Sequence, residues 1–274
     1  MATVSSRQFV KQVLHQRSFH RQDLRGALFS ECDLRGCNFQ AANLQGATFD
    51  TCRVGIAPQR LAIALIIVVL GALTMFHAVS TMLLGSIGTL PGNAAWPYVL
   101  ALYIALAVAG TNAGLQTLQQ PLAHPASLLT GGATGALLGF FYGGIWTDNN
   151  PTVAVISAVG VSFLGMLIVQ RWFTSLSTTI LGMLGAIAAY GLAFGLWTTA
   201  SSYLTTGNWG WGLTWGWIAF VYLGVALRSG GYSLRSLHQF ATTSFRKANL
   251  TDCTFTQTDW RQCDLGEAIG QFFT

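Results

Sequence analysis

A long stretch in the middle of the chain is almost free of charge. Between Leu61 and Leu227 the only cation is Arg171 and the only anion is Asp148. A soluble fold of this length needs a charged outer surface. Overall composition agrees, because 52% of the residues are hydrophobic and only 8% are charged, against roughly 25% charged in soluble proteins. The stretch is therefore predicted to lie in lipid.

Six segments of this stretch have about the length that a helix needs to cross a bilayer. Prolines, glycines and short polar breaks separate them, and all six prolines lie between the segments or in their first turns, where a missing amide is tolerated. The predicted spans cover residues 61–85, 96–118, 126–146, 152–172, 178–199 and 210–227.

The charges at the chain ends predict the orientation. Of the 14 Lys and Arg residues, eight precede the apolar stretch and five follow it. An even number of crossings places both termini on one side, and the positive-inside rule makes that side the cytosol. Arg171 then falls in an inner connection and Asp148 in an outer one. We expect a multi-pass protein of a bacterial inner membrane or a thylakoid-type membrane, with both termini cytosolic.

Small residues recur every four positions inside the predicted spans. The most regular stripe consists of Gly131, Gly135, Gly139 and Gly143. Such stripes let helix backbones approach closely, so packing within one bundle is the first interpretation. A glycine-lined pore or the seam of a homo-oligomer is the alternative. Asn112 and Gln116 are polar residues within a span, and they are interpreted as helix-packing groups or, alternatively, as part of a transport path.

Both chain ends carry a period of five residues, which neither a helix nor a simple strand has. A large apolar residue returns at every fifth position, and a small residue lies two positions before most of them. The large positions are Phe19, Leu24, Phe29, Leu34, Phe39, Leu44 and Phe49 in the first set, and Phe240, Phe245, Leu250, Phe255, Trp260 and Leu265 in the second.

These segments resemble the pentapeptide-repeat family, most closely in CDLRG (32–36), AANLQ (41–45), KANLT (247–251) and CDLGE (263–267). The resemblance implies a right-handed quadrilateral β-helix with four units per turn, in which both the large and the small positions point inward. Short solenoid arrays are marginal alone, and both sets lie on one side of the membrane. The predicted fold class is therefore a six-helix transmembrane bundle inserted into one small, split β-helix.

The expected domains follow from these patterns. Ser5 and Gln8 fit a capping box, and a helical apolar stripe follows, so a helix should cap the first coil. The predicted boundaries are a capping helix over 1–16, the first repeats over 17–56, the transmembrane domain over 57–228, the second repeats over 235–268 and a tail over 269–274.

The five cysteines all occupy the small inward position of a repeat. Their odd number cannot pair completely within one chain, and free cysteine behaves as a small buried hydrophobe. A metal site is not expected, because no histidine stands at a suitable spacing. The predicted solenoid core therefore includes Cys32, Cys37, Cys52, Cys253 and Cys263.

The sequence offers little for catalysis, and the protein is expected not to be an enzyme and to need no cofactor. No phosphate loop, dinucleotide fingerprint or metalloprotease motif occurs. His77 and His124 lie at opposite predicted depths, so they cannot hold one haem together, although either alone could contact a pigment. The repeats carry nearly balanced charge, which argues against mimicry of DNA and against a nucleic-acid partner.

The leading functional interpretation is a membrane scaffold or assembly factor whose cytosolic solenoid is a docking face for a protein partner. Outward polar residues such as Arg25, Arg35 and Gln45 are the expected contacts. Two alternatives remain at the level of sequence. One is a small channel or transporter built from the glycine-striped bundle, and the other is an accessory subunit of a larger membrane complex, including a photosynthetic one.

Overall fold

The computed structural model describes residues 7–15, 17–89, 92–118, 123–171, 175–270 and 272–273. The chain divides into two compact units, one formed by the residues up to Leu65 together with those from Leu237 onward, and the other by Ile66–Ser236. The first unit is built mainly from the repeats and the second from helices.

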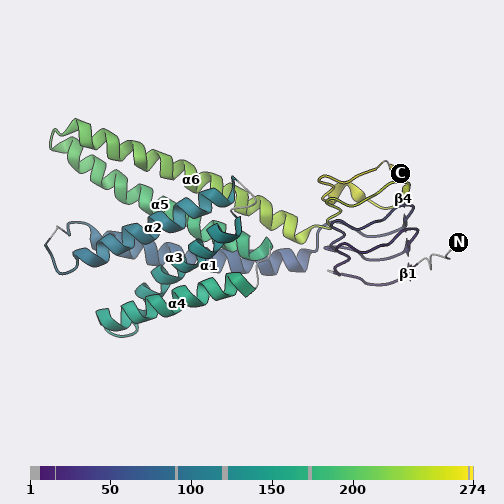
Figure 1. The fold of residues 1–274 in the computed structure, drawn as a ribbon, viewed down its shortest axis with the longest axis horizontal. Coiled ribbons are helices and arrows are strands. Elements are labelled where there is room, and N and C mark those ends of the chain that lie inside the picture. Colours follow the sequence, from purple (N-terminus) through teal and green to yellow (C-terminus); the bar gives the residue numbers. More distant parts are fainter. Residues whose placement is uncertain are drawn as a thin grey trace. The chain divides into compact units, whose positions relative to one another are not determined.

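The described part of the region between the repeats contains six long helices (Figure 1). Each is long and apolar enough to cross a membrane, as is typical of a multi-pass membrane protein. They are α1 (Pro58–Ser86), α2 (Trp96–Gln116), α3 (Ala123–Ile145), α4 (Pro151–Arg171), α5 (Ser175–Thr205) and α6 (Trp209–Ala241).

The last helix is much longer than the predicted span over 210–227. It continues to Ala241, because the sequence from Arg228 onward contains no proline and each helical amide finds its partner within the helix. The end of an apolar stretch predicts where a helix leaves lipid. It does not predict where the helix ends, because the helix can continue into the aqueous phase.

Inside the helical unit, α3 packs against α4, while α2 packs against both α3 and α5. A buried apolar cluster joins α1, α2, α3 and α5 through residues such as Met75, Leu106, Leu137 and Ala188. Small side chains dominate the closest crossings, as expected where helices associate by packing in lipid.

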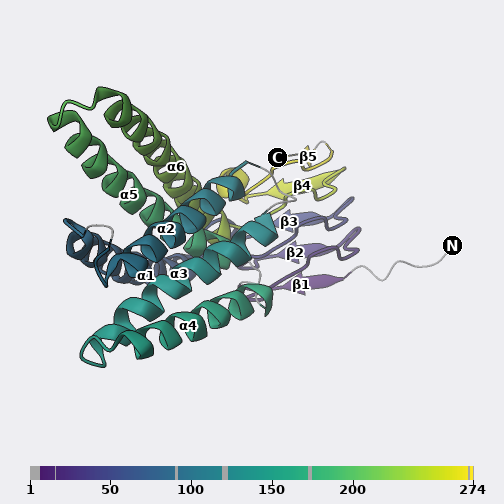
Figure 2. The same ribbon diagram turned by 60° about the vertical axis from the view of Figure 1, so that its left-hand side comes forward.

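The repeats form a solenoid with one parallel sheet on one of its faces (Figure 2). Its strands follow the order β1-β2-β3-β4-β5, so the C-terminal strands continue the sheet that the N-terminal strands begin. The strands are β1 (Gln8–Val10), β2 (Leu28–Ser30), β3 (Thr48–Asp50), β4 (Cys253–Thr256) and β5 (Phe272–Phe273).

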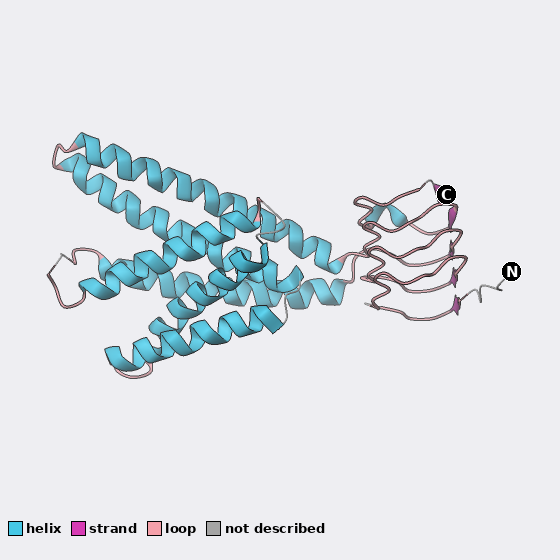
Figure 3. Ribbon diagram, in the orientation of Figure 1, coloured by secondary structure: helices cyan, strands magenta, loops and turns pink. Residues whose placement is uncertain are grey.

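The other faces are held by single β-bridges, drawn as loops in Figure 3. Ser18 pairs with Asn38, and Asn38 pairs with Ser244. Partners in the N-terminal part are 20 residues apart, as in Phe9 and Phe29, so each coil consists of four units of five residues. The second repeat set completes the coil that the first set leaves unfinished.

Phenylalanine side chains form two stacked columns through the interior. In one column Phe29 stacks on Phe49 and Phe49 on Phe255, each at 4.9 Å between ring centroids. In the other, Phe39 stacks on Phe245 at the same distance. Rings of the two columns meet edge to face at 5.8–6.1 Å, an arrangement that aromatic quadrupoles favour. Both columns cross from the first repeat set to the second.

The predicted capping helix is wrong for the described residues of 1–16. Gln8–Val10 is a strand paired in parallel with Leu28–Ser30, and Phe9 stacks on Phe29 at 4.8 Å. Phe9, Leu14 and Phe19 already follow the period of five, and pairing with the next coil outweighs the local helical pattern. The first coil thus begins before residue 17. The proposed cap residue Ser5 lies outside the described residues.

The second repeat set begins later than predicted and ends later. Residues 235–241 belong to α6, so Phe240 lies in a helix and outside the solenoid strands, and its side chain is not among those described. The predicted tail over 269–274 is instead part of the solenoid where it is described, because Ile269 pairs with Asn249 and β5 pairs with β4.

Candidate functional site

The helical region leaves the solenoid and returns to it at one corner. Ile56 pairs with Thr242 as an antiparallel bridge, and the Thr243 amide donates to the Gly55 carbonyl at 2.9 Å. Asp33 pairs with Arg53 on the face before this corner, and Asn38 pairs with Ser244 on the face after it. The helices are therefore inserted into a single turn of one coil without shifting the register of the coils.

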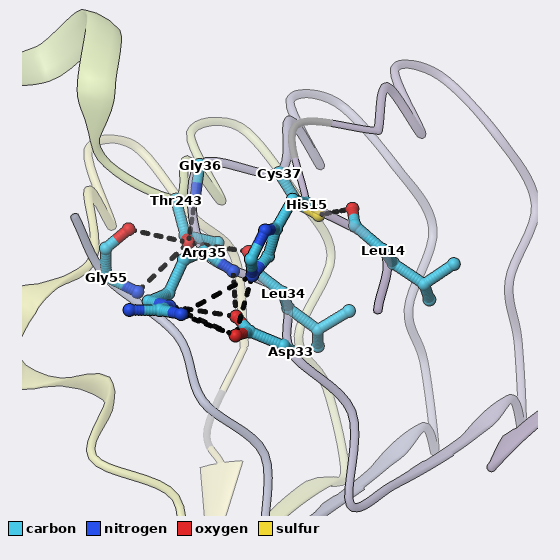
Figure 4. Close-up of polar contacts among 9 residues, drawn as sticks. All are labelled: Leu14, His15, Asp33, Leu34, Arg35, Gly36, Cys37, Gly55 and Thr243. Atoms are coloured by element: carbon cyan, nitrogen blue, oxygen red, sulfur yellow. Dashed lines mark hydrogen bonds and ion pairs between the residues drawn. The ribbon is translucent and has the colours of Figure 1, made fainter. Parts of the chain in front are cut away.

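The Thr243 hydroxyl closes this corner, as Figure 4 shows. It accepts from the amides of Gly36 at 3.1 Å and Gly55 at 3.0 Å, and it donates to the carbonyl of Leu34 at 2.9 Å or of Gly55 at 3.0 Å. Thr243 is fully buried, so these bonds satisfy backbone groups that water cannot reach. Thr243 stands two residues before Phe245, at the small position of a repeat, and nothing in the period of five indicates that its hydroxyl closes the corner.

The predicted core residues lie together. Every described large position from Phe19 to Phe255 is almost completely buried in one cluster, and Trp260 and Leu265 pack partly buried against it. Four of the cysteines are buried within the same cluster and Cys263 packs against it.

The cysteine thiols serve as small donors between coils. Cys37 donates to the Leu14 carbonyl and Cys253 to the Leu44 carbonyl, both at 2.9 Å. Burial raises the pKa of Cys52 and of Cys253 to about 11 and that of Cys263 to about 12. Such thiols stay protonated at neutral pH and are poor nucleophiles. Among the described residues, no group of three or more His, Cys, Asp and Glu is placed to hold a metal ion.

One ion cluster contains Asp33, the most buried side chain among the described ion pairs. The Asp33 side chain, 14% exposed, accepts from Arg35 at 2.7 Å and from His15 at 2.6 Å (Figure 4). Burial of Asp33 would raise its pKa, but hydrogen bonds from Arg35 and His15 outweigh burial and lower the pKa from 3.8 to about 2. The cluster ties the first coil to the second.

This cluster should make the solenoid sensitive to acid. Because the folded-state pKa of Asp33 is depressed, its stabilisation is present above about pH 4 and is lost as the pH falls toward 2. A pKa change from 3.8 to about 2 corresponds to about 2 kcal/mol. The free energy of unfolding of Asp33→Asn should lie below that of the wild type at pH 6 and approach it near pH 2. A difference that stays constant across this range would contradict the assignment.

The outward residues expected to contact a partner differ in their ion pairs and in their exposure to solvent. Arg25 forms an ion pair with Asp23 at 2.8 Å on its own turn, and both side chains are about half exposed. Gln45 is exposed one coil further on, and its carbonyl accepts from the Gly26 amide at 2.9 Å. Arg35 forms an ion pair with Asp33 at 2.7 Å. Arg25 and Gln45 thus belong to one column of turns, and Arg35 belongs to another.

The glycine stripe of α3 packs against α4. A β-carbon on Gly135 would lie 2.6 Å from the Val161 carbonyl oxygen, and one on Gly139 would lie 2.5 Å from that of Ser157. Gly131 faces Gly165 and Val169, and Gly143 faces Ser157. The four glycines therefore permit backbone contact between two helices, and α4 occupies the side on which a pore lining would have to be open.

Asn112 and Gln116 take different roles in α2. The Asn112 amide donates back to the Val108 carbonyl of its own helix at 2.8 Å. The Gln116 amide reaches α3, where it donates to the Thr130 hydroxyl at 3.2 Å. Only Gln116 links two helices, and it is buried.

The two histidines considered for pigment contact lie beside opposite ends of α3. His77 of α1 packs against Phe141 and Tyr142, with ring centroids 5.4 and 6.5 Å away, whereas His124 lies in the first turn of α3. Seventeen residues of helix separate His124 from Phe141, or about 25 Å. The two imidazoles cannot share one ligand.

A cavity of about 330 Å³ lies among α1, α2, α3 and α4. Met82, Leu102, Leu137 and Val159 contribute one wall residue from each helix, and Ser86, Thr89 and Tyr98 also line the cavity. The sequence gives no sign of this cavity, because its lining comes from four helices that are apolar on most faces and carry no distinguishing local signal.

Comparison with known families matches pentapeptide repeats in eight copies, at residues 18–53 and 243–270. No curated protein and no solved structure matches the chain. The matched segments flank the helical region and contain strands β2, β3 and β4 of the parallel sheet, together with most of the stacked phenylalanines. The chain thus carries two pentapeptide-repeat segments, and its described part contains six candidate membrane-spanning helices between them.

Proposed function

We propose that the protein is an integral membrane scaffold or assembly factor whose solenoid is a docking face for another protein. The observation that carries the proposal is the continuity of the solenoid across the inserted helices. Phe49 stacks on Phe255 and Phe39 on Phe245, so both ends of the helical region are fastened to one packed body. Such a body is a rigid platform, and rigid elements hold a binding surface with little ordering cost.

The orientation of this platform is part of the proposal. Because residues of both repeat sets pack into one solenoid, the two ends of the helical region lie on the same side of any membrane that it crosses. Six crossings satisfy that requirement, and the positive-inside rule favours the cytosol for the basic ends. We place the protein in a bacterial inner membrane or a thylakoid-type membrane.

The column that contains Arg25 and Gln45 is the proposed contact. Both side chains are exposed, the Arg25–Asp23 pair is at the surface and contributes little to stability, and neither side chain belongs to the core. Changing this column should remove a partner without unfolding the solenoid.

The test is purification of the tagged full-length protein from its own membranes in mild detergent, with its native mass, bound proteins and absorption spectrum recorded together. For the wild type we expect a stable complex with another protein. The double variant Arg25→Ala/Gln45→Ala should lose that protein, while Arg53→Ala, an exposed change on a different column, should keep it.

Three results would contradict the proposal. A colourless homo-oligomer without a second protein would favour a channel or transporter. A partner retained by the double variant, with the protease resistance of the solenoid unchanged, would exclude this column as the contact. A pigment spectrum that persists in every variant would move the interpretation to an accessory subunit held through its helices.

A further inference from the structure

The cavity among α1, α2, α3 and α4 lies at one end of the helical unit. At this end α1 and α3 finish, and α2 and α4 begin (Figure 1). Its volume of about 330 Å³ falls within the range of about 300–1,000 Å³ that is usual for ligand pockets. The space exists because four of the lining residues are alanines from three helices, namely Ala101, Ala105, Ala136 and Ala158.

The depth of the cavity matches one leaflet of a bilayer. Its lining on α2 runs from Ala95, the N-cap of the helix, to Ala105, which is about 15 Å at 1.5 Å per residue. The hydrocarbon core of a bilayer is about 30 Å thick, so each leaflet contributes about half of it. A volume of about 330 Å³ over this depth is a narrow channel. A helix about 10 Å in diameter would not fit.

Polar atoms line the cavity only near its shallow end. Ser86, Thr89 and Tyr98 lie close to the end of α1 and the start of α2, whereas the deep wall around Ala105 and Leu137 is apolar. The Ser86 hydroxyl donates to a carbonyl of its own helix at 2.7 Å. The hydroxyls of Thr89 and Tyr98 line the cavity and make no hydrogen bond to another described residue, so each can donate to a ligand.

The cavity is open toward the outside of the bundle. Val155 and Val159 of α4 both line it, yet Val159 is 66% exposed and Val155 is also exposed. Around a membrane-spanning bundle, the surroundings at this depth are lipid chains. A chain can therefore enter without leaving hydrocarbon. If the space stayed empty, the wall atoms would lose their dispersion contacts on one side.

The chemistry of the lining selects an uncharged, mainly apolar ligand. Among the described residues that border the cavity, none is charged. Burial of a charged group there would be costly, and apolar cavities do not hold water. We propose that the cavity binds one acyl chain of a membrane lipid, whose ester carbonyl accepts from the hydroxyls of Thr89 and Tyr98. The chain is recognised and the headgroup is not. This inference requires that the helices lie in a membrane, but it is independent of the proposed docking function.

The first test measures lipid retention by native mass spectrometry of the full-length protein. The protein is delipidated in mild detergent, and dioleoylphosphatidylcholine or dioleoylphosphatidylglycerol is then added. We expect one tightly held lipid per chain, with apparent Kd values for the two headgroups within about tenfold of each other. Oleoyl-lysophosphatidylcholine, with one chain, should also bind, and dihexanoylphosphatidylcholine, with two short chains, should not. A dependence on the headgroup with none on chain length would overturn the proposal.

The second test fills the cavity. Ala136→Phe places a ring in the space beside Leu137, so the apparent Kd for dioleoylphosphatidylcholine should rise about tenfold or more. Ile104→Phe is the matched control, because Ile104 is exposed on α2 and does not line the cavity; its Kd should equal that of the wild type. The thermal unfolding midpoint without added lipid shows whether each variant folds, and Ala101→Leu is a smaller insertion if Ala136→Phe does not. A folded cavity-filling variant that retains the lipid as tightly as the wild type would overturn the proposal.

Discussion

Replacement of Phe49 by alanine should cost the solenoid about 3–5 kcal/mol of its free energy of unfolding. Phe49 is fully buried and stacks between Phe29 and Phe255, with ring centroids 4.9 Å away on each side. It also meets Phe39 and Phe245 edge to face. The alanine variant therefore loses contacts with both repeat sets and leaves a cavity between neighbouring coils. Denaturant unfolding of the full-length protein in detergent measures the loss.

Two comparisons make this result specific. Thr48→Ala changes the neighbouring residue on the same strand, which lies outside the core cluster, and should stay within about 0.5 kcal/mol of the wild type. Limited proteolysis should then show new cleavage of Phe49→Ala in both repeat sets. If cleavage appeared only in the first set, the two sets would fold separately. Contacts between the two sets would then contribute nothing to the free energy of unfolding of the first set.

The second large effect is expected in the helical region. Gly139→Ala should destabilise the packing of α3 on α4 by about 1–3 kcal/mol, because the added β-carbon would lie 2.5 Å from the Ser157 carbonyl oxygen and 2.9 Å from the Val161 β-carbon. Relief of these contacts requires the two backbones to move apart. The helix propensity of alanine favours the variant by about 1 kcal/mol, so the measured loss is a lower bound on the steric cost.

Gly160→Ala on α4 is the matched control, since no atom lies within 4 Å of a β-carbon at that position. Its midpoint of thermal unfolding should equal or exceed that of the wild type, while that of Gly139→Ala falls by several degrees. Equal behaviour of the two variants would contradict close contact between α3 and α4. If the stripe lined a pore, substitution would alter solute flux in proteoliposomes and leave the unfolding midpoint in place.

Much of the architecture could be predicted because its signals are periodic and local. A return of Leu or Phe at every fifth residue, with Ala or Cys two positions earlier, resembles the pentapeptide-repeat pattern, and that resemblance implies a solenoid with these positions inside. The near absence of charge between Leu61 and Leu227 predicts membrane helices by the energetics of lipid alone. Neither signal depends on knowing which residues meet in space.

The element ends were less predictable. The segment around Phe9 fits both a helical stripe and the period of five, and only the presence of the next coil, with Phe29 at 4.8 Å, selects the strand. Similarly, the second repeats were predicted to begin at residue 235, but residues 235–241 continue α6. In each case a tertiary contact or an uninterrupted helical hydrogen-bond pattern outweighs a weak local pattern.

The amino-acid sequence by itself determined the period of the repeats, the apolar spans and the kind of residue at each inward position, because these depend on neighbours along the chain. Only the tertiary structure decided that Asn38 meets Ser244 across the inserted helices, that the α3 glycines face α4, and that α1, α2, α3 and α4 border a common cavity. Such pairings depend on which elements meet in three dimensions, and the free energy of close packing and hydrogen bonding selects them among many registers that the sequence pattern allows equally.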